Sequence, residues 1–170
     1  MRFYETDSTI ARQKQYAAMG FQAWLNAPMD RIWIPSGILT AVAMPSRLGR
    51  DLRNHLVTYG STARTVIAEK VSDEPLRSRF GDRWVWLTTP GQSDCTLPEH
   101  LSELGIEIVP RSESITLPSP PEERADIRWW IAEPASNVLP SLTYLLDHIS
   151  TYVNTIRYKN HRPSETEAIQ

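Results

Sequence analysis

Three arginines give the clearest chemical signal in the sequence. Arg47, Arg50 and Arg53 recur three residues apart, directly after Pro45 and Ser46. In an α-helix this spacing places the three guanidinium groups along one side, an arrangement that we call the arginine stripe. Guanidinium groups bind phosphate oxygens through paired hydrogen bonds, and the positive end of a helix dipole strengthens that attraction. The stripe therefore predicts contact with phosphates or nucleic acid, and a solvated outer helix face is the alternative.

Paired aromatic residues offer a second kind of binding chemistry. Trp84 and Trp86 alternate within one strand-like segment, and Trp129 is followed directly by Trp130. Tryptophan rings can stack on unpaired bases. However, Trp84 and Trp86 would share one face of a strand, where packing in a core or an interface is the commoner role. Both interpretations stay open at the level of sequence.

The sequence lacks the motifs of the common catalytic sites. The sequence contains no phosphate-binding glycine loop, no nucleophile elbow and no zinc-hydrolase helix motif. Its four histidines have no partner at a persuasive metal-ligand spacing. The single Cys95 follows Asp94, whose charge disfavours the thiolate that a nucleophile needs. We therefore predict no catalytic residue, no metal site and no cofactor.

Composition limits the classes of protein that remain. The chain has 170 residues, with 18 Lys and Arg against 20 Asp and Glu, for a net charge of −2. This balance argues against indiscriminate binding to nucleic acid or to anionic membranes. One cysteine excludes an internal disulfide framework, and no apolar run is long enough to span a bilayer. We expect a soluble, cytoplasmic protein with no membrane contact.

The elements that must position these residues follow from hydrophobic periodicity. Helices are predicted near residues 9–19, 46–59 and 98–104, and a long C-terminal helix is predicted with its cap at Ser136 or Asn137. Strands are predicted within residues 31–35, 38–44, 63–68, 84–89, 106–109, 114–117 and 127–131. This order predicts an α+β fold, a single mixed-sheet domain with flanking helices over residues 1–160. Residues 161–170 are predicted to form a disordered tail.

The order of several segments resembles a known family. The segments are Tyr16-Ala17-Ala18-Met19-Gly20-Phe21, Ile34-Pro35-Ser36-Gly37, Ala41 to Arg50, Arg83 to Gly91, and Ile115 to Pro120 leading to Arg128-Trp129-Trp130. Together they resemble the N-terminal module of bifunctional DNA primase/polymerases, in the archaeo-eukaryotic primase superfamily, and particularly its divergent actinobacterial relatives. The resemblance covers roughly residues 15–145 and implies a primase/polymerase-like fold with a role in DNA replication.

The resemblance also implies that catalysis has been lost. Active members of the family carry two aspartates, separated by one hydrophobic residue, that hold divalent metals for nucleotidyl transfer. The matching positions here are Ala43 and Pro45, and a shift of one residue gives Val42 and Met44 instead. None of these side chains can ligate a metal. The family's downstream histidine has no counterpart on the strand that contains Arg83.

Three functional hypotheses follow. The leading one is a catalytically degenerate primase/polymerase-like domain that binds nucleic acid, a nucleotide or a protein partner through the arginine stripe, helped by Arg83. The alternative is a protein-interaction or regulatory module without nucleotide chemistry, acting as a homodimer or with another chain. Its basis is the near-neutral charge, the six tryptophans and the apolar stripe of the last helix. A third hypothesis keeps an enzyme with a metal on Asp51, Asp82 and Asp94.

Overall fold

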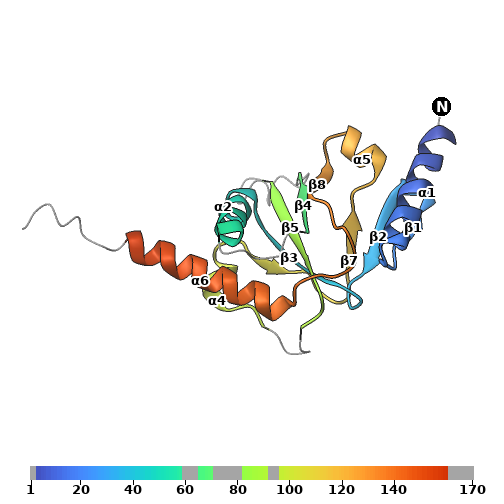
Figure 1. The fold of residues 1–170 in the computed structure, drawn as a ribbon. Helices are drawn as coiled ribbons and strands as arrows, with labels where there is room; N and C mark the ends of the chain where they lie inside the picture. The colour runs from blue at the N-terminus through green and yellow to red at the C-terminus, as the bar shows by residue number, and fades with distance from the viewer. Residues whose placement is uncertain (1–2, 59–64, 71–81, 92–95, 161–170) are drawn as a thin grey trace, which may run out of the picture.

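Helices and strands follow one another along the described part of the chain. The computed structural model describes residues 3–58, 65–70, 82–91 and 96–160 (Figure 1). The helical elements are α1 (Phe3–Ala18), the 3-10 helix η1 (Ala27–Met29), α2 (Ser46–Thr58), α4 (Glu99–Ser102), α5 (Pro120–Arg124) and α6 (Leu142–Asn160). The strands are β1 (Trp24–Asn26), β2 (Arg31–Pro35), β3 (Thr40–Pro45), β4 (Val66–Glu69), β5 (Arg83–Thr88), β6 (Glu107–Ile108), β7 (Ser114–Leu117) and β8 (Arg128–Ala132). The predicted α+β class is confirmed. The predicted tail and Cys95 lie outside the described residues.

The described strands form two antiparallel sheets. One sheet has three strands in the order β1-β2-β7, and the other has five in the order β6-β3-β5-β4-β8. The prediction of a single mixed sheet is therefore wrong. The chain leaves the first sheet after Pro35 and turns through Gly37, whose φ of +121° favours glycine. Consequently β2 and β3 follow one another in sequence but pair with β7 and β5. Alternating hydrophobic residues indicate a strand without identifying its partners.

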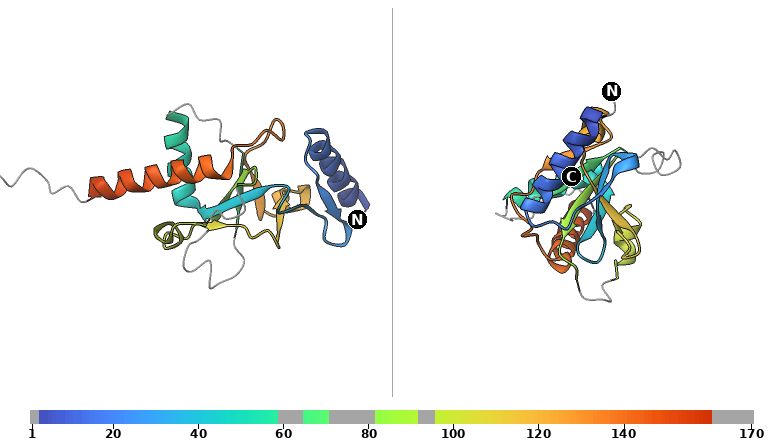
Figure 2. Two further views of the ribbon diagram at one scale, coloured as in Figure 1. Left: turned by 90° about the horizontal axis from the view of Figure 1, so that it is seen from below. Right: turned by 90° about the vertical axis from the view of Figure 1, so that its right-hand side faces the viewer.

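The five-stranded sheet is buried on both faces. Figures 1 and 2 place α2 and α6 on one side of this sheet and the three-stranded sheet on the other. The helix-side core includes Val42, Met44, Leu52, Leu56, Trp84, Trp86, Leu145 and Ile149. The sheet-side core includes Tyr16, Ile32, Ile34, Ala41, Ala43, Ile67, Val85, Ile115 and Leu117. Trp84 and Trp86 are thus core residues, which decides between their two interpretations in favour of packing.

Two helices begin at residues that differ from the prediction. α1 begins at Phe3 instead of near residue 9. α6 begins at Leu142, so the predicted cap at Ser136 or Asn137 is wrong. Instead, the Ser141 hydroxyl accepts a hydrogen bond from the backbone N–H of Tyr144 at 3.1 Å. Asn137 binds the end of α1, because its side-chain amide donates to the carbonyl of Gly20 at 3.1 Å.

No helix among the described residues has both the length and the apolar composition that a bilayer crossing requires.

Candidate functional site

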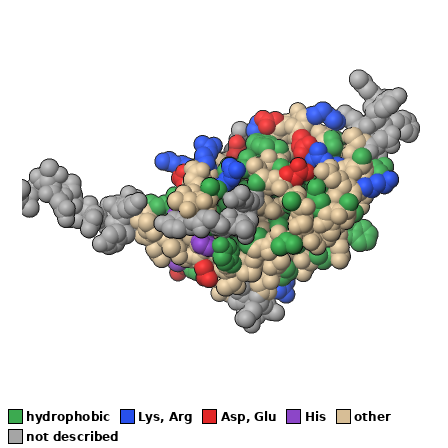
Figure 3. Space-filling model, viewed as in Figure 1, with side chains coloured by type: hydrophobic (Ala, Val, Ile, Leu, Met, Phe, Trp, Pro, Cys, Tyr) green, Lys and Arg blue, Asp and Glu red, His purple; other side chains and the backbone are tan. Residues whose placement is uncertain are grey.

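The arginine stripe lies on the outward side of α2. Arg47 and Arg50 are exposed and Arg53 is half-buried, whereas Leu52 and Leu56 on the opposite side enter the helix-side core. Figure 3 shows Lys and Arg side chains at the α2 end of the molecule, and others at the opposite end. All three arginines lie on α2, and their role in binding stays a prediction. Arg53 is more buried than the others because it is closest, around the helix, to the packed side.

The charges of the stripe are not neutralised within the described part of the chain. No ion pair there involves Arg47, Arg50 or Arg53. Asp51, the one acidic residue of α2, is exposed on the same helix. Guanidinium groups in this position can bind phosphate oxygens without first breaking an ion pair with any residue that the structure describes.

Arg83 does not join the stripe. It begins β5, and its guanidinium contacts Glu69 at 3.3 Å and Glu107 at 3.1 Å. Side chains alternate across a strand, and the next residue, Trp84, packs on the α2 side of the sheet. Arg83 therefore projects from the other face, and its charge is matched by two carboxylates.

The two positions that match the family's aspartates contain no metal ligand. Ala43 is buried between its partners Val85 and Glu107, and Pro45 pairs with Arg83 in the neighbouring strand. A cation beside this position opposes the binding of divalent metals. The residues present therefore do not fit the metal site that the resemblance implies.

No other described group has the composition of a metal site. The described residues contain no cluster of three or more His, Cys, Asp or Glu that could hold an ion. Asp51 lies on α2, Asp82 precedes β5, and Asp94 lies outside the described ranges. The structure thus does not bring these three aspartates together as a described site.

Next to Pro45, charged side chains form a continuous row of ion pairs. Its members are Glu107, Arg83, Glu69, Arg128 and Glu122. Arg128 contacts both Glu69 and Glu122, and Ser119 donates to Glu122 at 3.0 Å. We refer to these five residues as the ion-pair row.

The ion-pair row borders a pocket of about 210 Å³ between the two sheets, where residues of β7 form the opposite wall. Burial alone would raise the pKa of Glu69, but the charge and hydrogen bond of Arg128, together with those of Arg83, outweigh it and lower that pKa. Glu69, Arg83 and Arg128 meet because antiparallel pairing puts the end of β4 beside the beginnings of β5 and β8. Sequence reasoning missed this row, because only strand pairing brings the three residues together.

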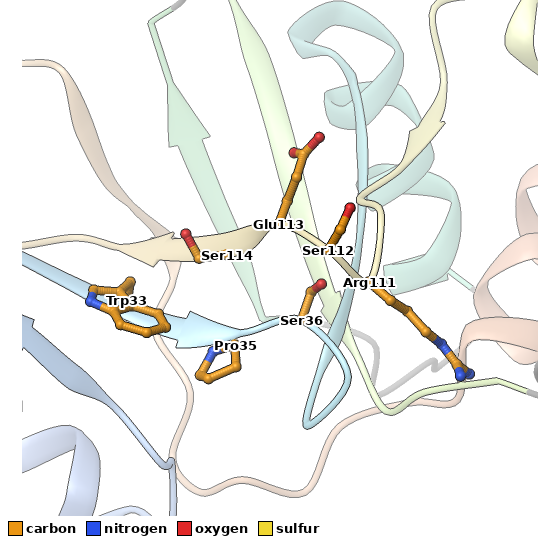
Figure 4. A pocket seen from close by; sticks show the side chains of 7 residues that line it. All are labelled: Trp33, Pro35, Ser36, Arg111, Ser112, Glu113 and Ser114. Carbon is orange, nitrogen blue, oxygen red and sulfur yellow. The ribbon is translucent and has the colours of Figure 1, made fainter.

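A larger open pocket lies where β2 ends and β7 begins. It has a volume of about 510 Å³ and is lined by Trp33, Pro35, Ser36, Arg111, Ser112, Glu113 and Ser114 (Figure 4). The side chains of Arg111 and Glu113 point away from one another in this view. A second pocket of about 280 Å³ shares Trp33 and Ser114 with it and is also lined by Asn26, Met29, Arg31 and Thr116.

Sequence reasoning also missed the position of Trp33, which lines both of these pockets. The signal was present in the alternation of Arg31-Ile32-Trp33-Ile34, which assigns Trp33 to the face opposite Ile32 and Ile34.

Comparisons with known proteins gave no match: no protein-family model, no curated protein and no solved structure is significantly similar to the chain. The resemblance to primase/polymerase modules therefore stays a prediction.

Proposed function

We propose that the chain is a catalytically degenerate primase/polymerase-like domain that binds nucleic acid through the arginine stripe. The observation that carries this proposal is the outward position of Arg47 and Arg50, with Arg53 beside them, on α2. A row of guanidinium groups on one helix side matches the spaced negative charges of a phosphate backbone. The motif order of the sequence supplies the family context.

The absence of catalysis in this proposal rests on the residues around Ala43 and Pro45. Nucleotidyl transfer in this family requires carboxylates that hold two metals. Glu69 of β4 and Glu107 of β6 are separated by two strands in the sheet, and both accept contacts from Arg83. These carboxylates are engaged in charge pairing, so the proposed function is binding only.

A charge-reversal variant tests the role of the stripe. The triple substitution Arg47→Glu, Arg50→Glu and Arg53→Glu should abolish binding to a labelled primer-template duplex, because each lost phosphate contact weakens the salt-dependent attraction. Fluorescence anisotropy at several salt concentrations measures both the affinity for the duplex and its dependence on salt. A double variant that still binds weakly should show a smaller slope of log affinity against log salt concentration. The slope should fall by about 0.9 for each phosphate contact removed.

The matched control is Lys14→Glu, an exposed charge reversal on α1, compared with Arg50→Glu alone. Both substitutions change the net charge equally, so a general charge effect would weaken binding equally in the two variants. We expect Arg50→Glu to be the weaker binder. Unchanged affinity in the triple variant would remove the stripe from the proposal.

A protein-interaction module is the second candidate function. It is supported by exposed apolar side chains near the beginning of α6, where Val138 is 84% exposed and Tyr144 is 40% exposed. Size-exclusion chromatography with light scattering tests this candidate directly. A homodimer that dissociates on Val138→Glu would favour it, and a strict monomer with no co-purifying partner would count against it.

A further inference from the structure

The outer face of the three-stranded sheet presents two stacked tryptophans. Trp24 of β1 and Trp33 of β2 are cross-strand partners, and their ring centroids lie 6.3 Å apart with an interplanar angle of 25°. Ile32 and Ile34 occupy the other face of β2 and enter the sheet-side core. The two indole rings therefore lie on the side of the sheet away from that core.

Large apolar side chains on this face of the sheet are exposed to solvent. Trp24 is 58% exposed, and Met29 nearby is 60% exposed. Trp33 lies between the pockets of about 510 and 280 Å³ and lines both of them. The half-buried Trp33 ring thus borders both hollows, the exposed Trp24 ring stacks beside it, and the hollows leave room for a flat ligand next to the ring pair.

Two arginines flank the tryptophans. Arg31 lines the smaller pocket and Arg111 the larger one, and the Arg31 side chain remains 51% exposed although its Nε lies 3.6 Å from Glu122. Arg111 is exposed as well. Glu113 is the one acidic side chain that lines either of these two pockets, and it points away from Arg111 (Figure 4). The flanking charge therefore favours an anionic ligand.

We propose that Trp24, Trp33, Arg31 and Arg111 form a platform for unpaired bases of single-stranded nucleic acid. The indole rings would stack on bases, and the two guanidinium groups would contact the adjoining phosphates. Bases in a duplex have their faces covered by neighbouring base pairs, so an aromatic platform selects single strands. A neutral sugar or an apolar peptide would use the rings but would leave Arg111 without a ligand contact and Arg31 with Glu122 as its one anionic contact.

The platform is separate from the arginine stripe. Figures 1 and 2 place α2 on one side of the five-stranded sheet and β1 with β2 on the other. The inference shares its ligand class with the proposed function and rests on it to that extent. Different residues carry the two proposals, so their tests separate them.

The test is the affinity of the full chain for a labelled oligothymidylate of about twelve nucleotides, a length within the usual range of site sizes. Trp24→Ala and Trp33→Ala should each weaken this binding by roughly 5- to 140-fold, the equivalent of one lost base stack. Trp24→Phe keeps an aromatic face and should retain most of the affinity. Duplex binding should stay the same in all three variants.

A variant that leaves the tryptophan packing unchanged shows whether weaker binding could result from misfolding instead. Arg111→Gln changes an exposed side chain, and it should weaken oligothymidylate binding and lower its logarithmic salt slope by about 0.7. Oligothymidylate should also quench tryptophan fluorescence less in Trp24→Ala than in the original chain.

Three outcomes would overturn the platform: no oligothymidylate binding by the original chain, equal affinity in the original chain and both alanine variants, or an equal loss of duplex binding in those variants. Loss of duplex binding in the Arg47, Arg50, Arg53 triple variant, with oligothymidylate affinity unaffected by the tryptophan changes, would keep the proposed function and reject the platform. The reverse pattern would keep the platform and reject the stripe.

Discussion

Glu69 lies at the centre of the ion-pair row, between Arg83 and Arg128. Its carboxylate is largely buried, and the two guanidinium groups stabilise its charged form, so its pKa is lowered from the ordinary value. A lowered pKa in the folded state means that the unfolded chain binds a proton more readily. The contribution of Glu69 to stability is therefore present above the ordinary pKa of 4.5 and is lost as the pH falls through the lowered value.

The variant Glu69→Gln isolates this contribution. At pH 7 it should lower the free energy of unfolding by roughly 2 kcal/mol, since two charge-assisted hydrogen bonds are weakened. The difference from the original chain should shrink as the pH falls below 4.5, where the unfolded chain begins to bind a proton at Glu69, and should disappear below the lowered pKa of the folded state. Urea unfolding at a series of pH values measures this difference in the free energy of unfolding. Glu103→Gln, at an exposed position, is the control, and a difference that stays constant with pH would contradict the assignment.

The predictability of the site differs from residue to residue for a physical reason. Arg47, Arg50 and Arg53 belong to one helix, where spacing in sequence fixes spacing in space. Arg83 was predicted to assist them, but its side chain projects from the opposite face of the sheet, where it contacts Glu69 and Glu107. Trp24 meets Trp33 across a strand pair, and such contacts depend on register, which the sequence does not reveal.

At the scale of elements, α2 lies against β5 through Gly49. A Cβ added at Gly49 would lie 2.9 Å from the Cβ of Trp84 and 3.0 Å from its Cε3. Such a separation is too short for two carbon atoms, and the Trp84 Cβ is fixed to its strand. Glycine is therefore required here by close approach, although it lowers helix propensity by about 1 kcal/mol relative to alanine.

Gly49→Ala should consequently destabilise the fold in spite of the better helix propensity. We expect a net loss of about 1–2 kcal/mol in the free energy of unfolding, because overpacking outweighs the gain. Asn54→Ala, on the exposed side of α2, should change stability by no more than about 0.5 kcal/mol. Chemical denaturation compares the two variants. A stabilised Gly49→Ala variant would mean that α2 can move away from β5 without loss.

Elements with strong local signals were the ones that the sequence predicted well. β2 and β7 have the predicted bounds, since each alternates between core and outer residues. The beginning of α6 was misplaced because Val138 fits the three- and four-residue spacing of the apolar stripe, although it precedes the helix and is exposed. The division into two sheets was missed because it depends on contacts between distant parts of the chain.

For the whole molecule, the central strands connect the two cores. β3 contributes Val42 and Met44 to the helix-side core and Ala41 and Ala43 to the sheet-side core. β5 alternates in the same way. Disruption of the five-stranded sheet would therefore expose the apolar side chains of both cores to water. A fold with this shared layer should unfold as one cooperative unit.

Two matched substitutions test this cooperativity. Ile149 of α6 is buried in the helix-side core and Ile34 of β2 in the sheet-side core. Each change to valine should cost about 0.5–1.5 kcal/mol, and the double variant should lose the sum within about 0.5 kcal/mol, because the two side chains lie in different cores. Near-UV and far-UV circular dichroism should report the same midpoint in every variant. If Ile149→Val shifted one signal and Ile34→Val the other, the two halves would unfold separately, and the five-stranded sheet would not couple them.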